Sequence, residues 1–404
     1  MVELVPLDLD AAASGVQERA VDLSQRIQPA HPYPPVSQKE SHMPLTDYLT
    51  LGRSGLRVSP FCLGTMTFGE DWGPVGTTVE ESRDVLAAYL DRGGNFLDTA
   101  NIYTKGHSEQ IIGDYFVEHP ARRDRVVIAT KFCGNMHPGD PNGGGSGRKA
   151  ILHQVHDSLR RLQTDHIDLL WCHFWDRHTP LEETMRTMDD LVRQGKVRYI
   201  GFSDHPAWVC AKANGLAALH GWEPLAAIQI EYSLLQRTPE EDLIPMAIDF
   251  GLGVTPWSPL RGGVLSGKFQ RDSRPKHGDT RVADNSPHLN ERTYALVDEL
   301  AAIGEAIGAT PAQVALHWVQ TRPGVTSTII GAKRLSQLED NLGAIDIVLT
   351  DDHRARLAAK SAFDKHFPHN FLDNIRPAIQ NGTTINAQKS DPWPLSPKDA
   401  SERH

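Results

Sequence analysis

Short apolar segments alternate with longer amphipathic ones along most of the chain from residue 48 onward. In the amphipathic segments, apolar residues recur at i, i+3, i+4 and i+7, as on one face of an α-helix. Such helices are expected at 79–93, 148–162, 181–195 and 207–221. Strands that alternate with helices in this way are typical of βαβ units built around a parallel sheet.

Eight of the short apolar segments are the predicted strands. They lie at 61–64, 95–98, 126–131, 167–173, 197–203, 226–231, 253–257 and 326–331. Eight strands with intervening helices predict an α/β fold, the (β/α)8 TIM barrel. Such barrels take about 250 residues as one domain, so the 404 residues of this chain do not require a second domain.

Two kinds of loop add to this plan. Gly52 and Gly55 separate two short alternating runs within 48–59, which predicts a β-hairpin that caps the bottom of the barrel. The connections 132–148 and 258–289 are long and contain several Gly and Pro residues. Both follow predicted strand ends, where barrel enzymes carry their active sites, so we expect them to be lid loops.

The barrel is expected to span residues 44–362, with an extension at each end. Residues 1–43 are poor in aromatic residues, and we expect a flexible segment with at most a short amphipathic helix over 16–27. In the tail, 363–404, the alternation decays. The tail is expected either to pack across the barrel or to remain mobile.

Composition narrows the function classes. A net charge of −10 gives no support for binding to nucleic acid or to an anionic membrane surface. The sequence shows no signal-peptide pattern and no apolar run long enough to span a bilayer. The four cysteines are scattered, without a CxxC pair, as in reduced proteins. We therefore expect a cytoplasmic protein with a small-molecule substrate, and homo-oligomerisation stays open.

Polar residues mark the ends of three consecutive predicted strands. Asp98, Lys131 and His173 each end an apolar run, and Tyr103 follows on the loop after Asp98. In a barrel these side chains converge at the carboxyl-terminal mouth. Each residue alone has an ordinary structural explanation, such as a solvated lysine or a core histidine. Their convergence favours a catalytic site.

The four residue types suit carbonyl chemistry. A phenol has a pKa near 10, and a neighbouring ammonium such as that of Lys131 is expected to lower the pKa of Tyr103. Asp98 would keep Lys131 charged in a closed pocket. His173 could donate a hydrogen bond to a substrate oxygen on which charge develops.

Other motifs give no support for different chemistry. Gly145, Gly147 and Ala150 form a GxGxxA pattern, but no strand directly precedes it, which disfavours a dinucleotide-binding loop of the Rossmann type. His153 and His156 lack the HExxH arrangement, and no other histidines show ligand spacing. We therefore expect no metal site. A GxSxG nucleophile motif is also missing from the sequence.

Over residues 48–361 the sequence resembles the aldo-keto reductases. The motifs that carry the resemblance are LGRSGLRVSPFCLGTMTFG, FLDTANIY with GHSEQIIG, ATK, HFWD, GKVRYIGFSD, QIEYSLLQR, WSPL with LSGK, and GAKRLSQLEDN. The chain is similar to the group that includes aryl-alcohol dehydrogenase-like and potassium-channel β-subunit-like members. The resemblance implies that Asp98, Tyr103, Lys131 and His173 form the catalytic tetrad of an alcohol dehydrogenase or carbonyl reductase, with Tyr103 as general acid and base.

The resemblance also implies NADP(H) as the cofactor, bound across the barrel mouth. The residues that match the cofactor-binding positions are Ser203, Asp204, Gln229, Trp257, Ser258, Leu260, Gly267, Lys268, Gly331, Lys333, Gln337, Asp340 and Asn341. Lys333, together with Arg334, offers positive charge for a 2′-phosphate, which favours NADP(H) while leaving NAD(H) open. Two positions depart from the common pattern, since Asp204 replaces an asparagine and Asp340 a glutamate.

Aromatic residues near the strand ends are expected to line a pocket for a bulky aldehyde, ketone, keto-sugar or alcohol. They are Phe68, Trp72, Phe132, Phe174 and Trp175. Two alternatives remain. One is an NADP(H)-binding regulatory or structural subunit with little turnover, and the other is oxidation of a sugar or steroid-like alcohol as the main activity.

Overall fold

The computed structural model describes residues 44–272, 275, 282 and 285–403, so the extension expected over 1–43 and part of the second lid loop lie outside the described residues. Eight parallel strands form the central sheet, in the order β10-β3-β4-β5-β6-β7-β8-β9. Beside β9 and β10 the ring is closed by a parallel bridge between Val254 and Val325 and by a 2.9 Å bond from Thr326 N to Val254 O. The predicted (β/α)8 barrel is confirmed.

Each predicted strand lies within two residues of an observed one. The strands of the barrel are β3 (Phe61–Gly64), β4 (Phe96–Asp98), β5 (Val127–Phe132), β6 (Ile167–Cys172), β7 (Val197–Ser203), β8 (Leu225–Glu231), β9 (Gly253–Trp257) and β10 (Thr328–Gly331).

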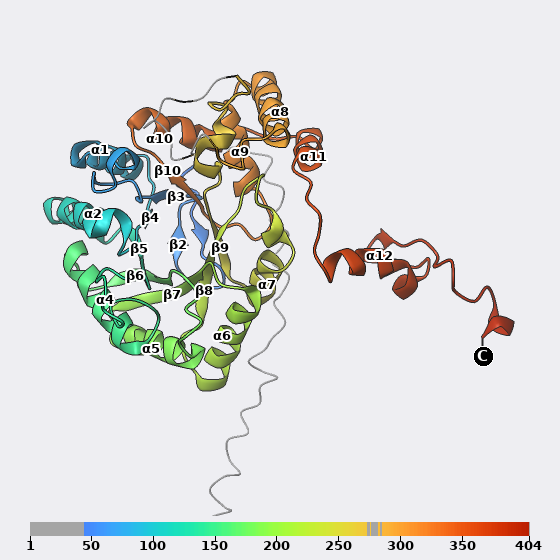
Figure 1. Ribbon diagram of the computed structural model, residues 1–404, viewed down its shortest axis with the longest axis horizontal. Helices are drawn as coiled ribbons and strands as arrows, with labels where there is room; N and C mark the ends of the chain where they lie inside the picture. The colour runs from blue at the N-terminus through green and yellow to red at the C-terminus, as the bar shows by residue number, and fades with distance from the viewer. Residues whose placement is uncertain (1–43, 273–274, 276–281, 283–284, 404) are drawn as a thin grey trace, which may run out of the picture.

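Helices surround the strands on the outside of the barrel (Figure 1). They are α1 (Val79–Asp91), α2 (His107–Glu118), α3 (Pro120–Arg123), α4 (Arg148–Leu162), α5 (Leu181–Arg193), α6 (Ala207–His220), α7 (Leu243–Phe250), α8 (Glu291–Ile307), α9 (Pro311–Gln320), α10 (Leu335–Leu342) and α11 (Asp351–Lys360). The first predicted helix, now α1, begins with a capping box in which Thr78 and Glu81 bond reciprocally.

The expected hairpin closes one end of the barrel. Its strands, β1 (Leu49–Thr50) and β2 (Arg57–Val58), pair antiparallel and bring Leu51 and Val58 into the apolar cluster inside the barrel. Gly52 has φ +59°, and a Cβ atom there would lie 2.5 Å from Gly253 N. Only glycine allows this close approach without a shift of the backbone.

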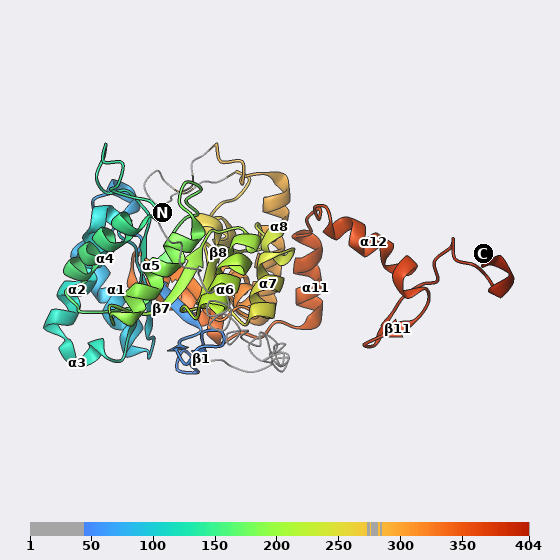
Figure 2. The ribbon, with the colours of Figure 1, turned by 90° about the horizontal axis from the view of Figure 1, so that it is seen from below.

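The described parts of the two long loops lie at the opposite end from the hairpin, where the carboxyl ends of the strands meet (Figure 2). The loop between β5 and α4 is closed at its base by a 2.8 Å bond from Gly145 N to Cys133 O. The hairpin therefore closes one end of the barrel, and the opposite end is available for a functional site.

The tail leaves the barrel after α11 and extends away from it (Figures 1 and 2). It contains α12 (His369–Gln380) and a two-stranded hairpin, β11 (Thr384–Ile385) with β12 (Gln388–Lys389). No residue of α12 is buried. Across the part of the chain that the structure describes, no helix is long and apolar enough to cross a bilayer.

Candidate active site

A buried lysine joins the polar residues at the strand ends. Lys131 lies in β5 and is fully buried. Its Nζ donates to Asp98 Oδ2 at 2.5 Å, to Thr99 O at 2.9 Å and to Tyr103 Oη at 2.9 Å. The other carboxylate oxygen of Asp98 accepts from Gln229 Nε2 at 2.9 Å. Each charge of the buried pair therefore has partners, which burial of a charge requires.

Tyr103 is held by an unusual backbone turn. The next two residues, Thr104 and Lys105, have φ of 44° and 58°, in the left-handed region that a β-branched residue rarely adopts. Thr104 Oγ1 offsets this strain by donating to Phe68 O at 2.6 Å and by accepting from Ser108 N at 3.0 Å. Strained turns of this kind often position functional side chains.

The electrostatics favour an ammonium beside a neutral phenol. Burial by itself lowers the pKa of Lys131, but the nearby Asp98 and Tyr103 more than offset it and raise that pKa above its usual value. Burial raises the pKa of Tyr103, and Lys131 only partly opposes this rise. The net direction for Tyr103 is opposite to the one expected from sequence, because the effect of desolvation outweighs that of the neighbouring charge.

His173 directly follows β6 and is a neutral base. Burial, with a smaller contribution from the charge of Lys131, lowers the pKa of His173 to about 2. The imidazole stacks on Phe174 with ring centroids 4.0 Å apart and meets Tyr103 edge-on at 6.0 Å. Its Nδ1 is buried and has no hydrogen-bond partner among the described residues. A neutral imidazole can donate one hydrogen bond to an oxygen atom in the cavity.

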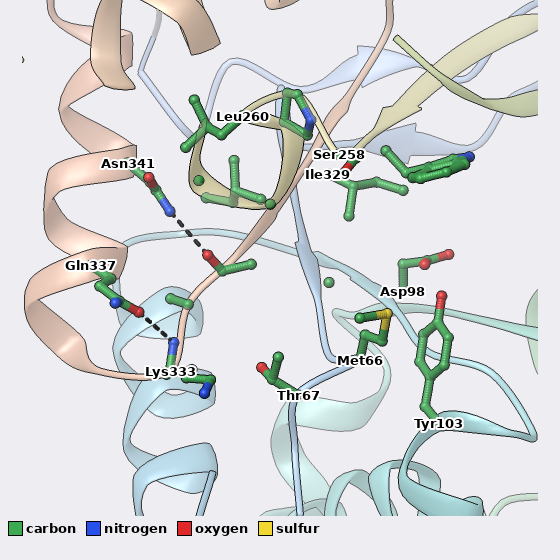
Figure 3. Close-up of a pocket in the computed structure, with 18 of the residues that line it drawn as sticks. Met66, Thr67, Asp98, Tyr103, Ser258, Leu260, Ile329, Lys333, Gln337 and Asn341 are labelled. Atoms are coloured by element: carbon green, nitrogen blue, oxygen red, sulfur yellow. Dashed lines mark hydrogen bonds between the residues drawn. The ribbon is translucent and has the colours of Figure 1, made fainter. Parts of the chain in front are cut away.

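These groups face a cavity of about 640 Å³ at the barrel mouth (Figure 3). Asp98, Tyr103 and His173 line it, while Lys131 lies beneath its floor. The cavity also extends to the loop after β9 and to α10. Its size is that of a pocket for a small molecule or cofactor.

Four of the residues matched to the cofactor site lie at the ends of β7, β8 and β9. Ser203, Asp204, Gln229 and Trp257 all line the cavity. Asp204 has φ +52° and accepts from Trp257 Nε1 at 2.9 Å, so it fixes the orientation of the indole. Burial raises the pKa of Asp204 above its usual value, and the hydrogen bonds from Trp257 and Ser203 only partly oppose this rise.

The loop after β9 carries four more of the residues matched to the cofactor site. Ser258, Leu260 and Lys268 line the cavity, whereas Gly267 is not among the lining residues of the described chain. Gly267 instead has φ +83° beside Lys268 and faces Pro311, from which an added Cβ atom would lie 3.1 Å away. It therefore shapes the loop that carries the lysine.

The segment from β10 into α10 closes the far side of the cavity. Gly331, Lys333, Gln337, Asp340 and Asn341 line it. Asn341 donates to Gly331 O at 3.1 Å, and Gln337 accepts from Lys333 N at 2.8 Å (Figure 3). Asp340 Oδ1 accepts from Thr310 and from Gln313, which ties α10 to α9.

The structure brings only two of the five aromatic residues proposed for the substrate pocket to the cavity. Trp72 and Phe174 line the cavity. Phe68 and Phe132 do not, because they are 0% and 1% exposed and pack in the core between strands and helices. Trp175 packs partly against that core and meets Trp208 edge-on at 5.4 Å. A large apolar side chain beside a strand end can turn either way, and sequence alone does not decide which.

Several residues that line the cavity were not predicted from the sequence. They include Met66, Thr67, Ile102, Gly262, Gly263 and Ser266. Met66 and Thr67 lie two and three residues after the end of β3, so their position close behind a strand end was a usable signal. Gly262 and Gly263 have φ of 66° and 95°, a conformation that the Gly-Gly pair itself suggests.

Comparison with known proteins places this site in a family. The sequence profile described as the aldo/keto reductase family matches residues 60–362. The chain is 35% identical over 330 residues to an aryl-alcohol dehydrogenase (NADP+) of Phanerodontia chrysosporium, covering 78% of this chain and 86% of that protein. It is 36% identical over 348 residues to an aryl-alcohol dehydrogenase of Pestalotiopsis microspora, covering 84% and 87%. It is also 36% identical over 331 residues to norsolorinic acid reductase B of Aspergillus parasiticus, covering 79% and 85%. The chain belongs to the aldo/keto reductase family.

Proposed function

We propose that this oxidoreductase interconverts aryl aldehydes or ketones with the corresponding alcohols and uses NADP(H), with Tyr103 as the general acid and base. The observation that carries the proposal is the contact of the buried Lys131 ammonium with both Asp98 and the Tyr103 hydroxyl, at the floor of an open cavity. A phenol in contact with a fixed cation can release its proton and then hold the resulting negative charge.

The lining of the cavity fits an extended dinucleotide. Lys268 and Lys333 line it and carry the positive charge that phosphates require, and the Lys333 ammonium donates to Pro74 O. An added Cβ atom at Gly331 would meet nothing within 4 Å, so open space adjoins the backbone two residues before Lys333. Trp257 and Asp204 would hold the nicotinamide end, and Gln337 and Asn341 the adenosine end. When bound, the cofactor supplies or accepts the hydride.

Each member of the tetrad has a separate task in carbonyl reduction. Tyr103 donates its proton to the carbonyl oxygen as that oxygen gains negative charge. Lys131 stabilises the phenolate that remains, and Asp98 keeps Lys131 charged in the buried position. His173, held neutral by burial, donates a hydrogen bond to the same oxygen and orients the carbonyl. In alcohol oxidation the proton moves in the opposite direction.

The walls of the cavity favour an aromatic substrate. Trp72 meets Tyr103 edge-on with ring centroids 6.3 Å apart, and Phe174 stacks on His173. These rings adjoin both groups assigned to the carbonyl oxygen, so an aryl group bound there would bring its carbonyl to the acid. The names of the fungal relatives, which act on aryl alcohols and norsolorinic acid, support the same class.

The site favours an enzyme over a regulatory subunit. A protein that only binds the cofactor has no need for the buried Asp98–Lys131 pair in contact with Tyr103. Burial of two charges costs several kcal/mol per ion before their mutual attraction is counted. The contacts of this pair with Thr99, Tyr103 and Gln229 offset that cost at the place where a proton must be transferred.

The test is oxidation of NADPH and of NADH, followed at 340 nm, with aryl aldehydes, aliphatic aldehydes and keto-sugars. We expect turnover with NADPH in preference to NADH and with aryl aldehydes in preference to sugars. Lys333→Ala should reduce the preference for NADPH about tenfold, as loss of a charge-assisted bond of about 1.5 kcal/mol predicts. Lys365→Ala, in the tail, is the control. Tight NADPH binding without turnover on any substrate would favour the regulatory subunit.

A further inference from the structure

Three potential metal ligands meet on the outside of the barrel, apart from the tetrad. His153 and Asp157 lie one turn apart on α4, and His137 lies on the loop between β5 and α4. The Nε2 atoms of both histidines are 3.9 Å from Asp157 Oδ2. One ligand atom from each of the three residues lies within 4.8 Å of the other two.

The loop holds His137 in place. His137 N donates to Asn135 Oδ1 at 2.7 Å, and Asp140 N donates to His137 O at 3.0 Å. Asn135 Nδ2 in turn donates to Asp140 O at 3.0 Å. These bonds form a turn that presents the His137 imidazole toward α4. The imidazole rings of His137 and His153 lie 5.2 Å apart, centroid to centroid.

The carboxylate of Asp157 is also held in place by a hydrogen bond. It is 9% exposed, and its Oδ1 accepts from Arg160 at 2.7 Å. This bond leaves Oδ2 as the carboxylate oxygen nearest to both imidazoles. Arg160 orients the carboxylate through Oδ1, as residues outside the ligand set often do in metal sites.

Two imidazoles and one carboxylate are a ligand set suited to zinc, with water as the fourth ligand. At metal–ligand distances of about 2.0–2.2 Å, ligand atoms of a tetrahedral site lie about 3.4 Å apart. The two imidazole–carboxylate separations of 3.9 Å exceed this spacing by about half an ångström, and the separation of the two imidazole ligand atoms is at most 4.8 Å. Rotation of the two half-exposed imidazoles would bring the three ligand atoms closer together. We propose that His137, His153 and Asp157 bind a divalent zinc-class ion that fastens the loop after β5 to α4.

The position of this site explains its structural effect. Gln154, next to His153, accepts from Cys133 N at 2.8 Å and from Asn101 Nδ2 at 3.0 Å through one oxygen atom. Helix α4 therefore already joins the base of the loop after β5 to the segment that carries Tyr103. A bound ion adds a second link between the loop and α4, nearer its tip. The spacing of the histidines along the sequence does not indicate this site, because the fold of the loop after β5 is what brings His137 close to α4.

The test is zinc binding by the tag-free, chelator-treated full chain, measured by titration calorimetry and by competition with a zinc indicator. We expect one ion per chain and slower amide hydrogen exchange in residues 134–144 when zinc is present. His137→Ala and His153→Ala should each weaken zinc binding at least tenfold. His156→Ala is the matched control, because His156 lies on the same helix and bonds Lys196 instead.

His137→Ala removes a loop side chain that is 46% exposed, so unfolding is not expected to explain its effect. Circular dichroism of each variant checks this. The proposal is overturned if the wild-type chain binds no zinc, if His137→Ala and His153→Ala bind it as tightly as the wild type, or if His156→Ala weakens binding equally.

Discussion

Lys131 organises the site because its ammonium group is surrounded by three oxygen atoms and reaches no water. One of them, in Asp98, carries the opposite charge, and another, in Tyr103, carries the proton that the proposed reaction would transfer. The meeting of Asp98, Tyr103, Lys131 and His173 could be predicted from sequence, because polar residues that end successive apolar runs must meet at one end of a barrel. The direction of the Tyr103 pKa could not, because it depends on how deeply the phenol is buried.

The directions of the pKa shifts predict the pH dependence of the reaction. The pKa of Tyr103 is raised, so the acid stays protonated and the kcat/KM for reduction should be flat from about pH 6 to 9. Oxidation needs the phenolate, so its kcat/KM should rise with pH over the same range. His173, with a pKa of about 2, should add no acidic limb. Initial rates in both directions across this range check the prediction, and an acidic limb near pH 6.5 would contradict it.

Among the secondary-structure elements, the strands were predicted accurately from the alternation of short apolar and longer amphipathic segments. Each of the eight strands begins and ends within two residues of its expected place, since buried parallel strands read as short apolar runs. Side-chain direction at the strand ends was harder to predict. Phe68 and Phe132 turn into the core, while Trp72 and Phe174 turn into the cavity, and the four look alike in the sequence.

The hairpin gives a direct test of how the bottom of the barrel is closed. Gly52→Ala should lower the free energy of unfolding by about 2–4 kcal/mol, because the new Cβ atom meets backbone and the left-handed φ disfavours alanine. Gly55→Ala is the matched control, since its Cβ atom would meet only Tyr199 Oη, at 3.9 Å. Urea denaturation measures both variants. Equal stability of the two would show that the hairpin does not approach the barrel this closely.

In the whole molecule, the tail makes few contacts with the barrel. The barrel is joined to the start of the tail by bonds such as those of His366 to Glu241 and His369 to Asp242. Beyond these, α12 exposes Phe371, Leu372 and Ile379 to solvent. The sequence left two arrangements open for the tail, because its weak periodicity does not say whether an apolar face finds a partner.

Removal of residues 371–404 tests this separation. The truncated chain should unfold within about 2 °C of the full chain, because the tail extends away from the barrel and no residue of α12 is buried. Reductase activity should also be unchanged. Differential scanning calorimetry and the 340 nm assay measure the two quantities. A fall in Tm of more than about 5 °C would show that the tail packs on the barrel.

In the proposed reaction, Tyr103 supplies the proton for carbonyl reduction. The most direct measurement compares NADPH-linked reduction of an aryl aldehyde by the wild type, by Tyr103→Phe and by the control Tyr48→Phe, together with NADPH affinity for each. We predict that Tyr103→Phe loses about 10²–10⁴-fold in kcat, the size of a general-acid contribution, while NADPH affinity and the Tyr48→Phe rate stay near wild type. A Tyr103→Phe protein that reduces the aldehyde as fast as the wild type would show that Tyr103 does not supply the proton.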